Sequence, residues 1–243
     1  MKKIGLICII GLTIFSCSEK QKNDNKETTK TEDLTKRQIM RKEIDENLPT
    51  IGILIFEGVI MNEVVAPLDV FSNPSVDEKK LFNVITIATN KETYNSAHGL
   101  KINPDYIIGN VPDLTVLVVP SSYNPTNQTS DKKLVDFIKE QNKTTEYIAS
   151  HCAGAFLIGE SGIAANKEIV TYVTGGEGLK KDYPNLKVAD DNKVAVVQDG
   201  KFISSNGSLV TYVASFDLLE KLTNKEHRKF VETSILFDKI RAL

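Results

Sequence analysis

The 243-residue sequence is poor in the residue types that mark several protein classes. It has three histidines and three cysteines, and its formal net charge is −2. Scattered histidines and few thiols do not supply the ligand set of a metal site, so we expect no metal. Nor do we expect another cofactor. Near-neutral charge with 7% aromatic residues gives no reason to expect a nucleic-acid partner. Tryptophan is absent, which excludes no class of protein.

The amino terminus carries an apolar run, Ile4–Phe15, that is too short to span a bilayer. Two lysines precede it, as in a secretory signal. The stretch "TIFSCS" resembles a bacterial lipobox, which implies cleavage after residue 16 and lipidation of Cys17 with acyl chains such as palmitate. We therefore expect a lipoprotein anchored in the bacterial cell envelope, either facing the periplasm or at the outer membrane. Ordinary signal cleavage, or a buried apolar end, is the alternative.

This interpretation leaves a single thiol in the mature chain. Cys8 leaves with the signal and Cys17 carries lipid, so only Cys152 remains and no internal disulfide can form. An unpaired thiol outside the cytoplasm is prone to oxidation unless it is buried or has a use.

Residues 17–48 and 49–243 differ sharply in composition. The first segment is polar and is predicted to be a disordered tether behind the lipidated cysteine. The second alternates apolar runs with amphipathic stretches, which predicts a flavodoxin-like α/β three-layer sandwich: a mostly parallel sheet with helices on both faces. Strands are predicted at 50–56, 81–88, 114–120 and 168–173, a strand running into a helix at 146–162, a hairpin turning at Asp199-Gly200, and helices at 60–71, 131–143, 208–223 and 226–243, with Ser130 as the cap of the second helix.

The segment "EYIASHCAGAFLIGESG" places Cys152 where a strand meets a helix. Ser150, Cys152 and Gly154 have the small–x–nucleophile–x–small spacing of a nucleophile elbow. The positive end of the helix after Ala153 is expected to lower the thiol pKa, and its free amides can hold an oxyanion. Buried cysteines are common, so packing at a tight turn is the alternative interpretation.

Four segments together resemble the ThiJ/PfpI family of the class I glutamine amidotransferase-like superfamily over residues 50–223. They are "ILIFEGVIMNEVVAPLDVF", "HGLKINPDYII", "ASHCAGAFLIGESGIAANKEIVT" and "DGKFISSNGSLVTYVASFDLLEKL". The resemblance implies that Cys152 is the reactive cysteine and that Glu63 is the acid that bonds the thiol or moves its proton. It also implies an oxyanion hole built from backbone amides, here of Ala153 and Ser121, and a homodimer.

The sequence departs from the family pattern at two places. Serines stand in "VVPSSYNP" where relatives have glycines, and Tyr172 stands near a position where many relatives have histidine. His151 is a weaker catalytic candidate, because neighbouring side chains on an extended segment point to opposite sides. His98 is expected in a turn and His227 on the surface.

Two functions follow from the resemblance. The first is a cell-envelope, cofactor-free, cysteine-dependent hydrolase or lyase, of hydratase or glyoxalase type, that acts on a small electrophilic molecule. The alternative is a lipoprotein of the same fold that senses oxidants through Cys152 or binds a ligand without turnover.

Overall fold

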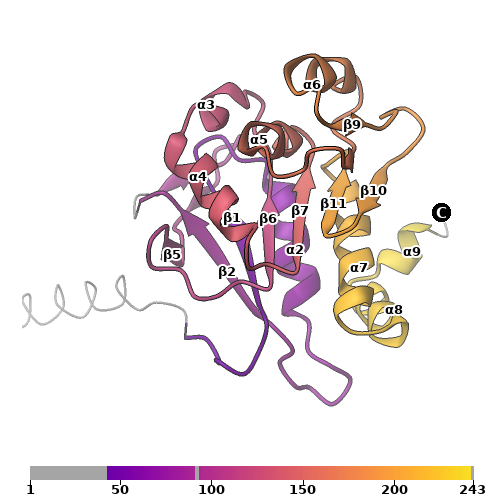
Figure 1. The fold of residues 1–243 in the computed structure, drawn as a ribbon. Coiled ribbons are helices and arrows are strands. Elements are labelled where there is room, and N and C mark those ends of the chain that lie inside the picture. The colour runs from indigo at the N-terminus through magenta and orange to yellow at the C-terminus, as the bar shows by residue number, and fades with distance from the viewer. Residues whose placement is uncertain (1–42, 91–92, 242–243) are drawn as a thin grey trace, which may run out of the picture. The chain divides into compact units, whose positions relative to one another are not determined.

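The computed structural model describes residues 43–90 and 93–241. A seven-stranded sheet in the order β10-β11-β7-β6-β1-β2-β5 runs through its centre (Figure 1). All neighbouring strands are parallel except β10 with β11. The strands are β1 (Thr50–Leu54), β2 (Asn83–Ala88), β5 (Tyr106–Ile107), β6 (Val116–Val119), β7 (Tyr147–His151), β10 (Val196–Asp199) and β11 (Phe202–Ser205). The predicted signal, Cys17 and most of the predicted tether lie outside the described residues.

Helices cover both faces of this sheet, which confirms the predicted three-layer α/β fold (Figure 1). On one face α2 packs against α7, α7 against α8 and α8 against α9. On the other face α4 and α5 pack together, with α3 and α6 beside them. The helices are α2 (Met61–Ser72), α3 (Thr126–Thr129), α4 (Lys132–Gln141), α5 (Gly154–Ser161), α6 (Gly176–Asp182), α7 (Val210–Leu222), α8 (Lys225–Ser234) and α9 (Phe237–Arg241).

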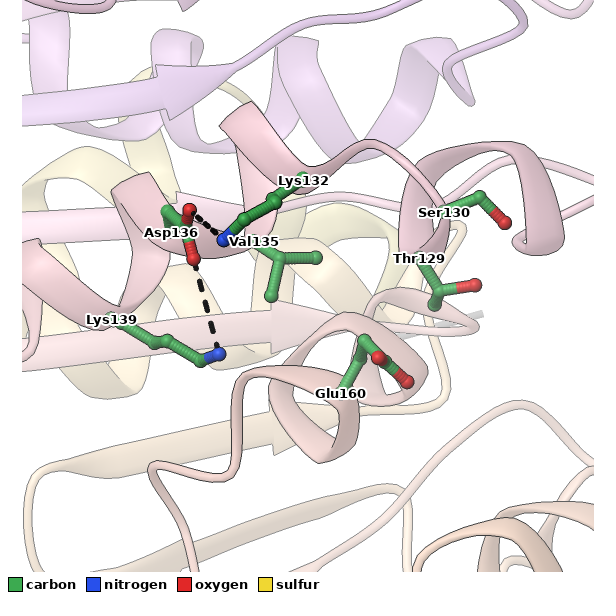
Figure 2. A pocket seen from close by; sticks show the side chains of 7 residues that line it. All are labelled: Thr129, Ser130, Lys132, Val135, Asp136, Lys139 and Glu160. Carbon is green, nitrogen blue, oxygen red and sulfur yellow. Dashed lines mark hydrogen bonds and ion pairs between the residues drawn. The ribbon is translucent and has the colours of Figure 1, made fainter.

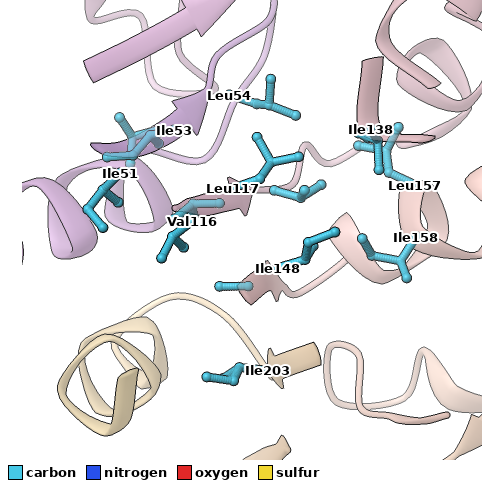
Figure 3. Packing of buried hydrophobic residues seen from close by; sticks show 14 of the residues in the cluster. Ile51, Ile53, Leu54, Val116, Leu117, Ile138, Ile148, Leu157, Ile158 and Ile203 are labelled. Carbon is cyan, nitrogen blue, oxygen red and sulfur yellow. The ribbon is translucent and has the colours of Figure 1, made fainter. Parts of the chain in front are cut away.

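The central strands are apolar on both of their faces because helices cover both sides of the sheet. Ile51, Ile53, Leu117 and Ile148 are each at most 1% exposed, and Figure 3 shows their side chains packed with those of the helices. Burying a side chain of this size is worth about 1.5–3 kcal/mol relative to leaving it exposed. These continuous runs therefore hold the strands that carry the site.

Three local predictions were wrong. The single helix predicted at 226–243 is two helices, α8 and α9, and Leu236 between them has φ +61°. The helix predicted to be capped by Ser130 is capped by Asp131, whose carboxylate accepts from the amides of Lys133 and Leu134. The strand predicted at 168–173 is only β8 (Glu168–Ile169), which pairs with β9 (Lys187–Val188) in a separate two-stranded sheet.

The predicted hairpin that turns at Asp199-Gly200 is confirmed, because β10 and β11 pair antiparallel on either side of it. A small hairpin, β3 (Tyr94–Asn95) with β4 (Lys101–Ile102), precedes β5. No helix among residues 43–90 and 93–241 is long and apolar enough to cross a membrane.

Candidate active site

Cys152 sits on a strained turn between β7 and α5. Its φ is +53°, a left-handed conformation that costs a non-glycine residue about 1–2 kcal/mol. Two hydrogen bonds hold the turn: the Cys152 amide donates to the Ser205 carbonyl at 2.8 Å, and the Thr171 hydroxyl donates to the Cys152 carbonyl at 2.8 Å. Strain of this kind gathers at functional positions. The predicted nucleophile elbow is present.

The small residue after the elbow has a steric reason. A Cβ at Gly154 would lie 2.3 Å from the Val119 carbonyl oxygen and 2.9 Å from that of Pro120. The first turn of α5 therefore passes directly over the end of β6, and only glycine fits there.

Glu63 brings a carboxyl group to Cys152 from the first turn of α2. It is fully buried, and its two oxygens accept from backbone amides: Oε2 from Ser121 at 2.7 Å and Oε1 from Ser208 at 3.3 Å. Its carboxyl is also hydrogen-bonded to the Cys152 thiol. The structure thus brings together the two side chains that the sequence assigned as reactive cysteine and acid.

Burial makes both members of this pair weak acids. It raises the pKa of Glu63, although hydrogen bonds from Ser121 and Ser208 oppose the shift. Burial, followed by the negative charge of Glu63, raises the pKa of Cys152 to about 11, while the Ser121 side chain and the Ala153 amide act in the opposite direction. The sequence predicted a lowered thiol pKa, and this was wrong: burial and the charge of Glu63 outweigh the donor at the start of α5.

The loop after β11 packs directly against Cys152 and Glu63, although no residue of this loop was predicted to belong to the site. Gly207 has φ +88°, and a Cβ there would lie 2.4 Å from both Cys152 Cβ and Glu63 Oε1. The Gly207 amide donates to the Ser205 hydroxyl at 3.2 Å, which ties the loop to the end of the strand. A polar, glycine-containing stretch directly after a buried strand, Asn206–Ser208, was the available signal.

The His151 side chain contacts Ser205 rather than the Cys152 thiol. It is 1% exposed, and its Nδ1 is hydrogen-bonded to the Ser205 hydroxyl at 2.8 Å. Its Nε2 has no hydrogen-bond partner in the part of the chain that the structure describes. Burial lowers its pKa to about 3, so the ring is neutral. The ring therefore supports the β7–β11 junction, and no described contact joins it to the Cys152 thiol.

The two candidate oxyanion amides are already engaged. The Ser121 amide donates to Glu63, as given above, and the Ala153 amide donates to the Cys152 sulfur itself. Both amides therefore act on the thiol–carboxyl pair in this arrangement.

The remaining aromatic and histidine candidates lie elsewhere. The Tyr172 ring stacks on Phe156 with centroids 6.3 Å apart. His98 is exposed and meets the Tyr123 hydroxyl at 3.3 Å. His227 was predicted on the surface, but it is only 8% exposed; the turn of its helix packs its ring inward. None of these side chains is brought to the sulfur by a described contact.

A polar pocket lies between the α3–α4 segment and α5 (Figure 2), and Cys152 is not among the residues that line it. Its walls include an ion-paired group of Lys132, Asp136 and Lys139, with Glu160 opposite. No cluster of three or more potential metal-ligating histidine, cysteine or acidic side chains occurs within the described ranges 43–90 and 93–241.

These features define the class of the protein: it is a three-layer α/β protein with a cysteine at a nucleophile elbow and a buried carboxyl beside that cysteine. A sequence model of the DJ-1/PfpI family matches residues 49–221, and the chain belongs to that family.

Individual relatives agree with this assignment. The chain is 25% identical over 186 residues to the isonitrile hydratase of Pseudomonas putida, covering 76% of this chain and 77% of that protein. It is 26% identical over 148 residues to Protein dj-1beta of Drosophila melanogaster, covering 60% and 76%. The crystal structure of a ThiJ/PfpI family protein from Pseudomonas syringae superposes with a TM-score of 0.70 at 18% identity, covering 82% and 83% of the two chains.

Proposed function

We propose that this chain is a cofactor-free enzyme whose Cys152 attacks a small electrophilic molecule, with hydration of the substrate as the favoured outcome. The observation that carries the proposal is the buried Cys152–Glu63 pair at a strained elbow. The similarity to an isonitrile hydratase supports an isocyanide, or another neutral electrophile with one reactive carbon, as the substrate.

The reaction on an isocyanide balances without a redox partner. The Cys152 thiol gives its proton to Glu63, and the sulfur bonds to the terminal carbon. The Glu63 carboxyl returns the proton to that carbon, which leaves a thioimidate. Water then adds across the carbon–nitrogen double bond, with its hydroxyl going to the carbon and a proton to the nitrogen. The carbon–sulfur bond breaks as the carbonyl forms, and the hydroxyl proton passes to the sulfur. The product is an N-substituted formamide, the sum of substrate and water.

Glu63 suits the proton transfers in this sequence. Its raised pKa means that the carboxylate takes up a proton more readily than an exposed glutamate does. Because each carboxyl oxygen already accepts an amide N–H, the group stays in place while its proton comes and goes.

Turnover by matched variants tests the proposal. The parent, Cys152→Ala and Glu63→Gln are incubated with a panel of isocyanides and with methylglyoxal, and product is followed by chromatography. We expect turnover by the parent, none above background by Cys152→Ala, and a loss of about 10²-fold or more by Glu63→Gln. Turnover that survives in Cys152→Ala would refute the cysteine mechanism.

A second candidate function is oxidant sensing by the same thiol. It is favoured by the partial exposure of Cys152 together with the engagement of His151 by Ser205, because among the described residues Glu63 is then the titratable side chain that acts on the thiol. Hydrogen peroxide would oxidise the sulfur to sulfenic and then sulfinic acid and would itself be reduced to water. Mass spectrometry of peroxide-treated parent and Glu63→Gln detects this; oxidation without any turnover of the substrate panel selects the sensor.

The same proposal places the protein in the bacterial cell envelope, anchored by lipid on Cys17 and assembled as a homodimer. The signal-like run and the lipobox-like stretch support the anchor. Cys17→Ala is expected to move the protein from the membrane fraction to the soluble fraction, and retention on membranes contradicts the anchor.

Light scattering of the domain measures its assembly state, and a monomer at micromolar concentration contradicts the proposed homodimer.

A further inference from the structure

Ser121 presents two hydrogen-bonding groups to the site, and only one of them is used. Its amide donates to Glu63 Oε2 at 2.7 Å. Its hydroxyl oxygen is buried, and no hydrogen bond of standard geometry satisfies it in the described part of the chain. The residue as a whole is 1% exposed. A buried hydroxyl without a partner is costly, which indicates a task that the resting arrangement does not show.

Two hydrogen bonds of its backbone groups hold Ser121 in place. The Ser121 carbonyl accepts from the Ile60 amide at 2.8 Å, while the Ser121 amide is held by Glu63, so both sides of the residue are tied to the start of α2. The hydroxyl is also within reach of the Cys152 sulfur and of the Glu63 carboxyl, and it lowers the pKa of each group. It is therefore a donor fixed beside the reacting sulfur.

We propose that the Ser121 hydroxyl is a further catalytic group of this site, which donates a hydrogen bond to the Cys152 sulfur once the thiol proton has moved to Glu63. In this step the sulfur loses its proton, a carboxylate oxygen gains it, and Ser121 keeps its own. The inference rests on the proposed function for the proton transfer to Glu63, whereas the hydrogen bond from Ser121 to the sulfur is tested without a substrate. The Ser121 amide, which the family resemblance implied for oxyanion binding, is occupied by Glu63, so the hydroxyl is the group of this residue that remains for the sulfur.

Thiolate formation in this site needs such a donor. Burial opposes a negative sulfur even after Glu63 has taken up the proton, and the Ala153 amide is the one backbone donor that contacts the sulfur among the described residues. A hydrogen bond to a charged group is about twice as strong as one between neutral groups, so the hydroxyl gains most at the moment the thiolate forms.

Alkylation of Cys152 by iodoacetamide, followed from pH 7 to 11, measures this effect without any substrate. We expect Ser121→Ala to slow alkylation by about tenfold at each pH below the thiol pKa, because the thiolate loses a charge-assisted hydrogen bond. Ser121→Thr keeps a hydroxyl and should restore most of the rate. A Ser121→Ala profile that superposes on that of the parent would overturn the proposal.

Ser122 provides the matched control. It is the next residue, it is 7% exposed, and its hydroxyl is hydrogen-bonded to Gln128 at 2.5 Å rather than facing the sulfur. Ser122→Ala therefore removes a buried serine hydroxyl without touching the thiol, and its alkylation profile should match that of the parent. An equal slowing in both variants would show a general loss of structure and would overturn the specific role of Ser121. Circular dichroism checks folding, and Ser121→Gly replaces Ser121→Ala if the latter does not fold.

Failure of this inference is distinct from failure of the proposed function. If alkylation depends on the Ser121 hydroxyl but no electrophile is turned over, the donor role stands and the enzyme proposal fails. If Cys152-dependent turnover is found and Ser121→Ala alkylates like the parent, the enzyme proposal stands and the donor role fails.

Discussion

Gly207 is the position where one added methyl group should damage both the fold and the site. A Cβ built there lies 2.4 Å from Cys152 Cβ and 2.4 Å from Glu63 Oε1, well inside van der Waals contact, and 3.1 Å from the Cys152 amide nitrogen. The backbone φ of +88° also disfavours any residue with a side chain. Gly207→Ala therefore combines backbone strain with overlap against both Cys152 and Glu63.

Backbone strain and steric overlap each lower the free energy of unfolding by a typical amount. The left-handed backbone costs alanine about 1–2 kcal/mol relative to glycine. Overpacking against a buried site that cannot yield costs typically about 1–3 kcal/mol more. We therefore expect Gly207→Ala to lower the free energy of unfolding by about 2–5 kcal/mol. The overlap is relieved only if the thiol, the carboxyl or the loop moves, so the contact between Cys152 and Glu63 should weaken as well.

Gly99→Ala separates these two effects. Gly99 has nearly the same backbone conformation, φ +84°, but a Cβ there meets no atom within 4 Å. It should show only the strain, about 1–2 kcal/mol, and leave Cys152 unchanged. Urea unfolding of both variants gives the stabilities, and the rate of iodoacetamide alkylation against pH reports on the thiol. If Gly207→Ala is no less stable than Gly99→Ala and alkylates like the parent, the close approach of the loop to the pair is refuted.

Two further predictions concern stability. Because burial raises the folded-state pKa of Glu63 above its ordinary value of 4.5, this group favours folding below that pH, and the contribution is lost as pH rises through the folded-state pKa. The urea-unfolding free energy of Glu63→Gln relative to the parent should therefore increase with pH above about 4.5; parallel pH curves contradict this. Asp131→Ala should lower the free energy of unfolding by about 1 kcal/mol, because it removes the cap of α4, whereas Ser130→Ala should change it little. Equal effects of these two substitutions would contradict the observed cap.

The fold was predictable where strands are buried on both faces. The runs that became β1, β2 and β6 are short and apolar, and those of β1 and β6 are followed by residues at helical spacing, a pattern with few alternatives. Secondary-structure prediction failed where a local residue pattern did not determine the pairing partner of a strand or the cap of a helix. Glu168–Ile169 reads like a central strand, yet its partner Lys187–Val188 has no apolar pattern of its own. Ser130 and Asp131 are both good caps, and only the hydrogen bonds decide between them.

The sequence predicted that Cys152 and Glu63 lie together, but it did not predict the residues that surround them. Cys152 was proposed from the elbow spacing, and Glu63 from the family resemblance. Gly207 and Ser208 were missed because their importance depends on contacts across a long stretch of chain: Ser208 lies 145 residues from the carboxylate that it bonds. The thiol pKa was also mispredicted, because a helix terminus is visible in sequence, whereas burial and a neighbouring carboxylate are not.

A thiol pKa near 11 does not prevent Cys152 from acting as a nucleophile, because the pair has to be considered as one unit. Glu63 and Cys152 are hydrogen-bonded, so moving the proton from sulfur to carboxylate leaves one negative charge in the same buried volume. The burial penalty that makes each group a weak acid alone is then nearly unchanged by the transfer. Hydrogen-bond donors decide whether the negative charge rests on the Glu63 carboxylate or on the Cys152 sulfur. The amides of Ser121 and Ser208 favour the carboxylate, and the Ala153 amide favours the sulfur. The balance is therefore sensitive to any donor that can turn toward the sulfur.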